Sequence, residues 1–192
     1  MSTHTLARSL HDLGLAAWFG GTLANATALN AAAGAAESPT STGAVANVGW
    51  DRWTPVNAAA IGAHVVGSLG MLGSDLGRVA AQGGTRRTVA VKTALTAAAL
   101  GVTAYSRLLG RRVSDDTHVP AASGTEPSNR TPRDVAEAQR KLRLLQWAVP
   151  ALTGALVVIS ARAGEEQRPT NAIAGAIEGV RGGVAALVPG LS

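Results

Sequence analysis

The chain alternates four long apolar stretches with polar segments. Residues 13–36, 54–74, 93–106 and 144–161 contain no Asp, Glu, Lys or Arg. A helix that spans a bilayer needs ~20 mostly apolar residues, and each stretch with its helical flanks supplies that length. The pattern therefore predicts an all-α fold, an integral membrane four-helix bundle with both termini on one side of the membrane.

A soluble, alanine-rich helical bundle is the alternative interpretation. Helices at the surface of soluble proteins present a charged or polar face along their whole length, and residues 13–36 present none. A secretory signal is the alternative for this first stretch. His11 and Asp12 at its start, together with its length, favour a retained helix instead.

The predicted helices cover about 5–34, 54–81, 85–113 and 132–163, in a transmembrane domain of residues 1–168. Residues 35–49 are rich in Ser, Pro, Thr, Gly and Asn and are expected to form a loop, and 114–131 a second polar loop. Thr54-Pro55 suits a helix start, because Thr can cap and Pro is tolerated in the first turn.

Residues 169–192 form an amphipathic C-terminal segment, with apolar residues at helical spacing. We expect an additional short helix there. Whether it lies on the membrane surface, docks on a partner or frays is left open by the pattern.

Composition narrows the function classes. The chain contains no cysteine, which excludes disulfides and thiolate metal sites, and its net charge is +5. The basic residues are scattered beside the predicted helices, where they meet lipid headgroups, so no nucleic-acid partner is expected. They divide almost evenly between the two membrane faces. The short basic turn at Arg86-Arg87 favours cytoplasmic termini in a multi-pass protein of the cell membrane.

Polar residues inside predicted membrane helices are costly and are candidates for function. His11, Trp18 and Asn25 recur at seven-residue steps on the first helix, and Asn57 and His64 do so on the second. Matching depths between adjacent antiparallel helices places His64 near Asn25. The same matching places His11 and Asp12 near Asp75, with Lys92 at a similar depth. The candidate ligand-binding residues are His64, Asn25, Asn57, Asp75, His11, Asp12 and Lys92.

Two interpretations of these residues stay open. They form either a polar seam that carries a proton, an ion or a small ligand, or a set of groups that satisfy one another and set helix register. The same depth argument separates His11 from His64 by ~15 Å or more, which argues against a haem or copper ion shared between them. No metal site and no catalytic motif is predicted, so we expect no enzyme.

The opening segment HDLGLAAWFGG, His11 to Gly21, resembles the first helix of small copper-resistance-D-like membrane proteins. Those proteins have a His followed about seven residues later by Trp-x-Gly, and His11, Trp18 and Gly20 fit that spacing. The resemblance covers about one helix. The alanine, glycine and arginine usage resembles that of membrane proteins from high-GC actinobacteria, and neither resemblance implies a reaction.

The first functional hypothesis is a small non-catalytic membrane protein that acts as an accessory or assembly subunit of a membrane complex, or as a homo-oligomer. Rows of small residues such as Ala59, Ala63 and Gly67 allow the close helix packing that this role needs. The expected partners are the lipid bilayer and other membrane subunits. The alternative is a transporter for a small ligand, an ion or a proton built around His64, and a haem or copper redox carrier is a third hypothesis.

Overall fold

The computed structural model describes residues 3–81, 83–114 and 119–166, apart from the side chains at 74–75, 77–81, 83 and 166. It is mostly helical, as predicted. The chain divides into two compact units, Met1–Val157 and Val158–Ser192. The described part of the second unit is the C-terminal end of a helix, residues 158–166. The predicted amphipathic segment 169–192 lies outside the described residues.

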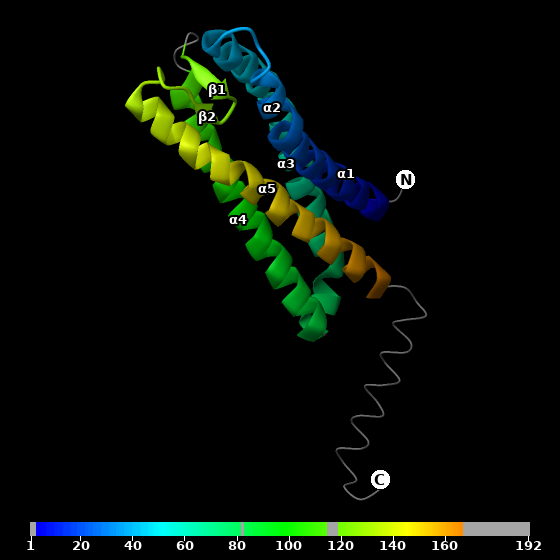
Figure 1. Cartoon of the computed structure of the whole chain (residues 1–192). Helices are drawn as coiled ribbons and strands as arrows, with labels where there is room; N and C mark the ends of the chain where they lie inside the picture. The colour runs from blue at the N-terminus through cyan, green and yellow to red at the C-terminus, as the bar shows by residue number, and fades with distance from the viewer. Residues whose placement is uncertain (1–2, 82, 115–118, 167–192) are drawn as a thin grey trace, which may run out of the picture. The chain divides into compact units, whose positions relative to one another are not determined.

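Four long helical segments make up the described chain (Figure 1). The first comprises α1, a π-helical turn η1 and a short α2, and it is followed by α3, α4, a two-stranded hairpin and α5. The bounds are α1 Thr3–Ala24, η1 Asn25–Leu29, α2 Asn30–Ala33, α3 Pro39–Ala81, α4 Gly83–Ser114, β1 Ala121–Ser123, β2 Glu126–Pro127 and α5 Arg133–Glu166.

The loop predicted at 35–49 is wrong, because α3 begins at Pro39. Ser38 is the residue before that helix, and its hydroxyl accepts a hydrogen bond from the backbone N–H of Ser41 at 3.1 Å. A serine cap followed by proline at the first helical position is a strong start signal. Thr54 and Pro55 therefore lie inside α3, where the Thr54 hydroxyl donates to the Trp50 carbonyl one turn earlier at 2.8 Å.

The polar segment 114–131 also contains regular structure. β1 and β2 pair antiparallel, with Ala121 opposite Pro127 and an irregularity between Ala121 and Ser123. A turn follows, in which the Thr131 side chain accepts from the Ser128 N–H at 2.8 Å and donates to the Pro120 carbonyl. α5 begins directly after this turn.

Three helices are long and apolar enough to cross a bilayer, over Pro39–Gly73, Gly84–Ser114 and Arg133–Glu165. These segments support a membrane protein. α1 is not among them, since its regular α-helical part ends at Ala24 and includes Arg8, His11 and Asp12. The described residues therefore contain three candidate membrane crossings.

α1 and α3 pack side by side and antiparallel, more closely than any other pair of described helices (Figure 1). Glycines make this possible. A Cβ atom at Gly14 would lie 2.5 Å from the backbone nitrogen of His64, and one at Gly67 would lie 2.3 Å from the backbone nitrogen of His11. Small residues allow such close approach where lipid provides no hydrophobic drive between helices.

α4 and α5 contribute side chains to two clusters within the first unit. One cluster lies near the hairpin and joins α4, α5 and Val119. The other contains Trp18, Ala60, Ala99 and Val149, one residue from each of α1, α3, α4 and α5. The second cluster forms an apolar layer across the four helices.

Candidate functional site

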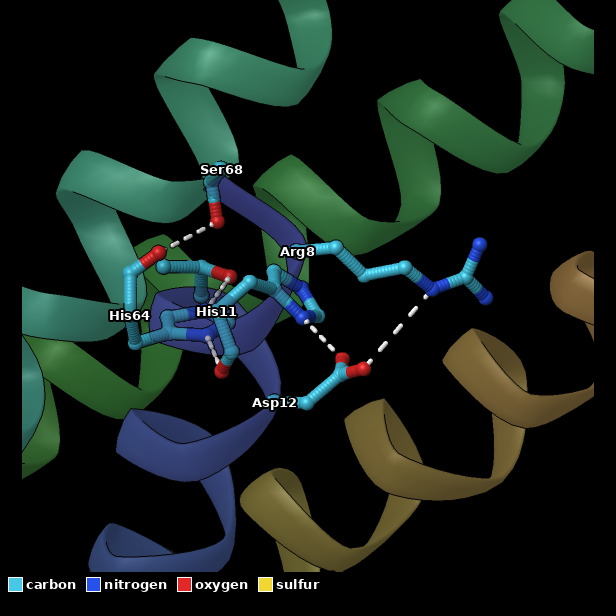
Figure 2. A network of polar contacts seen from close by, with 6 residues as sticks. Arg8, His11, Asp12, His64 and Ser68 are labelled. Carbon is cyan, nitrogen blue, oxygen red and sulfur yellow. Dashed lines mark hydrogen bonds and ion pairs between the residues drawn. The ribbon is translucent and has the colours of Figure 1, made fainter. Parts of the chain in front are cut away.

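The central feature of the α1–α3 interface is a pair of stacked histidines (Figure 2). The ring centroids of His11 and His64 are 4.6 Å apart, with a 45° angle between the ring planes. Both side chains are buried, with 2% and 1% of their surfaces exposed. The prediction that they lie ~15 Å or more apart is wrong. The physical reason is the early start of α3, which shifts the register between the two helices by about four turns.

A short motif on each helix explains why the two rings meet. His11 and His64 are each followed three residues later by a glycine, Gly14 and Gly67. Because the helices run antiparallel, each glycine faces the backbone of the opposite histidine. The two His-x-x-Gly segments therefore form a reciprocal contact. This repeat is visible in the sequence and was the signal that could have identified the pair.

One side of the pair connects to exposed charged residues. The carboxylate of Asp12 accepts a hydrogen bond from Nδ1 of His11 at 2.7 Å, and its second oxygen lies 3.8 Å from Arg8. Figure 2 shows the Asp12 side chain between Arg8 and His11. Asp12 is 58% exposed, so its carboxylate connects the buried histidine pair to the surface by a hydrogen bond.

The other side of the pair reaches α4. Nδ1 of His64 donates to the backbone carbonyl of His11, and its Nε2 pairs with the Thr96 hydroxyl, both at 3.4 Å. A carbonyl only accepts, so Nδ1 carries the hydrogen and Nε2 of neutral His64 accepts from Thr96. Lys92 lies on α4, four residues and about one turn before Thr96, and therefore near the histidine pair.

Two ring nitrogens beside the pair lack partners in the described structure. Nε2 of His11 and Nε1 of Trp18 are buried without a hydrogen bond. Since Nδ1 of His11 donates to Asp12, the Nε2 atom of the neutral ring has a free lone pair. The Trp18 ring lies 6.1 Å from His64. The site thus keeps a buried proton acceptor whose hydrogen-bonding capacity is unused.

The structure brings four of the predicted site residues to one region and places two others apart from it. His64, His11, Asp12 and Lys92 belong to the pair and its surroundings. Asn25 does not contact His64 as predicted, because the α1–α3 register places it near the Trp53 end of the interface. Asn57 lies two turns from His64 along α3. The side chain of Asp75 lies outside the described part of the chain.

Sequence reasoning missed a second polar site, at Asn30. This residue is 3% exposed. Its side chain donates to Gln146 at 2.7 Å and accepts from the indole N–H of Trp50 at 3.0 Å, and its carbonyl accepts from the Gly124 N–H at 3.2 Å. Asn30 therefore joins α2, α3, α5 and the hairpin.

The histidine pair does not fit a haem iron held between its rings. Two imidazoles that ligate a haem iron from opposite faces, each at ~2 Å, have ring centroids about 6 Å apart, and these lie 4.6 Å apart. Among the described residues, no group of three His, Cys, Asp or Glu side chains could hold a metal ion. The third hypothesis therefore has no geometric support in this pair.

Comparisons of the chain with family models, curated proteins and solved structures find no significant match. The resemblance of the first helix to copper-resistance-D-like proteins stays a prediction.

Proposed function

We propose that the protein is a small multi-pass membrane protein that relays protons through the His11–His64 pair. The observation that carries this proposal is the arrangement of an exposed carboxylate, a buried imidazole with a free Nε2, and a second imidazole stacked on it. Ionisable groups inside a membrane helix are costly, and they mark proton or ion paths when they persist. The N-terminal helical segment is, in this proposal, the fourth crossing.

The relay follows from the hydrogen bonds. A proton that binds Nε2 of His11 converts the ring to imidazolium, and its Nδ1–H then donates to the ionised Asp12 carboxylate. Transfer of that Nδ1 proton to Asp12 breaks the N–H bond, forms an O–H bond and leaves a neutral ring protonated at Nε2. Asp12 is exposed and can release the proton to water. Rotation of the His11 ring about its Cβ–Cγ bond then directs an N–H toward Asp12 again and returns a free lone pair to the buried side, which completes the cycle. Histidine suits this task because its unperturbed pKa lies near neutrality.

A proton fits the site better than a metal cation does. A metal ion is held by several ligands, and the described residues lack a three-ligand group. A proton needs only one lone pair, and His11 provides it.

The test is proton flux into liposomes that contain the purified protein and an internal pH dye, with the membrane potential clamped by potassium and valinomycin. Wild-type protein should acidify the interior faster than empty liposomes under an imposed pH gradient. His11→Gln and His64→Gln should each reduce the protein-dependent rate at least about tenfold. A wild-type rate equal to that of empty liposomes would overturn the proposal.

Ser68→Ala is the matched control. The Ser68 hydroxyl donates to the backbone carbonyl of His64 at 2.7 Å rather than to either ring (Figure 2). Its removal should leave the flux unchanged. Equal losses in Ser68→Ala and His64→Gln, together with lower folded yield, would assign the pair a structural role.

A second candidate function, an accessory subunit of a membrane complex, is favoured by the exposure of α4. Only 6% of its 18-residue apolar stretch is buried within the chain. Ala94, Ala97 and Gly101 lie on its uncovered surface, and nothing lies within 4 Å of a Cβ built at Gly101. Gentle extraction from native membranes, size-exclusion chromatography and mass spectrometry of co-eluting proteins test this role. A monomer that elutes alone would contradict it.

A further inference from the structure

Beyond the histidine pair, the inner faces of three helices carry a second set of polar side chains. On α4, Thr103 lies seven residues after Thr96 and therefore on the same face. On α3, Asn57 lies seven residues before His64. The His64–Thr96 and Asp51–Arg107 contacts align the two helices, and this alignment places Asn57 at the level of Thr103.

The polar atoms at this second level are buried and have no partner in the described structure. They belong to α3, α4 and the π-helical turn, and include both donors and acceptors. The atoms are Asn25 Nδ2, Trp53 Nε1, Asn57 Oδ1, Thr103 Oγ1 and Ser106 Oγ. The Trp53 ring lies against Gly21 of α1, which places the indole at the α1–α3 interface.

Other hydroxyls in these helices show that the two on α4 are unusual. Helical Ser and Thr side chains commonly donate to the carbonyl one turn earlier. Thr22, Thr54, Ser68 and Thr153 all do so here, at 2.7–2.8 Å. Thr103 and Ser106 make no such bond. Their hydroxyls are available to a group outside the protein.

The apolar layer separates this second level from the histidines. Ala60 lies between Asn57 and His64 on α3, and Ala99 lies between Thr96 and Thr103 on α4. Both are buried and belong to the cluster that contains Trp18. On the far side of the second level, the exposed Asp51–Arg107 pair lies 3.4 Å apart, at the hairpin end of α3 and α4.

Energetics indicates what satisfies these atoms. Each unsatisfied polar group in a bilayer interior costs several kcal/mol, and a folded protein has only about 5–15 kcal/mol of net stability. Five such groups are therefore incompatible with a dry interface. None of the five side chains is charged, so their mixture of donors and acceptors matches water rather than an ion.

We propose that the side chains at the second level, defined by Asn25, Trp53, Asn57, Thr103 and Ser106, bind a chain of water molecules that is continuous with bulk water at the hairpin end. This inference rests on the proposed function and deepens it. The water chain would conduct protons from bulk water at the hairpin end to the apolar layer that lies next to the histidine pair. When a proton moves along such a chain, each water molecule accepts one proton and forms a new O–H bond, and it breaks another O–H bond to donate a proton to the next water.

The experiment uses the absence of cysteine from the wild-type sequence. Thr103→Cys and Ser106→Cys introduce single, nearly isosteric thiols, and a small aminoethyl thiosulfonate reagent reacts with them in liposomes. Only ionised thiols react quickly, and thiols ionise in water rather than in lipid. We expect both variants to react at least about tenfold faster than Ala104→Cys.

Ala104→Cys is the matched control because Ala104 is exposed on the lipid-facing side of the same helix, next to Thr103. Leu108→Cys is the corresponding control for Ser106, with 59% of Leu108 exposed. Reaction rates at 103 and 106 no higher than at 104 and 108, in variants with wild-type tryptophan fluorescence, would overturn the inference. The labelling experiment does not depend on proton flux. Fast labelling at 103 and 106, combined with no protein-dependent flux in the liposome experiment, would therefore support the water chain and contradict the proton relay.

Discussion

Two polar sites lie where the N-terminal helical segment, α1 to α2, packs against α3, and they differ in how completely their hydrogen-bonding groups are satisfied. At Asn30, both side-chain atoms and the carbonyl have partners on three other elements. At the histidine pair, two contacts of His64 are long, and Nε2 of His11 has no described partner. A saturated polar site fixes structure, whereas an unsaturated one keeps capacity for a ligand or a proton. We therefore expect Asn30 to determine stability, and the histidines to determine proton flux in the proposed function.

The largest loss of stability is expected from a substitution that forces α1 and α3 apart. Gly67→Ala places a Cβ 2.3 Å from the His11 backbone nitrogen, and neither helix backbone can yield locally. We expect a loss of about 3 kcal/mol in the free energy of unfolding, measured by denaturant titration in detergent micelles. Gly62→Ala is the control, because nothing lies within 4 Å of that position. Equal stability of the two variants would show that α1 and α3 do not pack this closely.

The next effect tests the saturated site. Asn30→Ala removes the partners of Trp50 Nε1 and Gln146 at once and leaves both half-buried groups unpaired. We expect a loss of about 2 kcal/mol in the same titration, since each orphaned group adds its desolvation penalty. Thr27→Ala is the control, because the Thr27 hydroxyl is exposed and bonds its own helix. A loss no larger than that of the control would contradict the structural role of Asn30.

A smaller effect is expected when only one partner is removed. Trp50→Phe deletes the indole N–H that donates to Asn30 and retains most of the ring surface. The free energy of unfolding should fall by about 1 kcal/mol. The double variant with Asn30→Ala should lose less than the sum of the single losses, because the two changes remove the same hydrogen bond. Additive losses would show that the two residues act independently.

The smallest effect on stability is expected at the unsaturated site. His64→Leu keeps a similar volume and removes two hydrogen bonds of 3.4 Å each. The loss should stay below about 1 kcal/mol, while proton flux in liposomes falls to the background. A loss as large as that of Asn30→Ala would instead make the histidines a structural site and remove the basis of the comparison.

Much of the helical fold is readable from the sequence, but the register is not. The charge-free stretches locate the long helices, and the seven-residue steps of His11, Trp18 and Asn25 identify the inner face of the first. The pairing of His64 with His11 instead of Asn25 depends on the length of the connection between helices. Ser38-Pro39 carried that information as a cap and a first-turn proline, and the polar composition of 35–49 concealed it.

Asn30 could not be assigned from periodicity for a different reason. In an α-helix, a residue five positions after Asn25 points well away from it, at 3.6 residues per turn. The π-helical turn changes this, because the Asn30 N–H donates to the Asn25 carbonyl. One wider turn therefore places Asn30 above Asn25, on the inner face. The sequence of residues 25–29 contains no pattern that predicts a π-helical turn.

That π-helical turn has a consequence for changes in chain length. A π-turn amounts to one extra residue inserted in an α-helix. Removal of Thr27, whose hydroxyl is exposed and bonds its own helix, would let residues 24–30 close as a regular α-helix with Asn30 still on the inner face. A one-residue deletion, which elsewhere in α1 would rotate every later side chain by about 100°, should here be tolerated. We expect unchanged Trp50 fluorescence in a chain without Thr27 and a shifted spectrum in a chain without Ala16. That result would show that the π-helical turn can lose one residue without rotating the side chains that follow it.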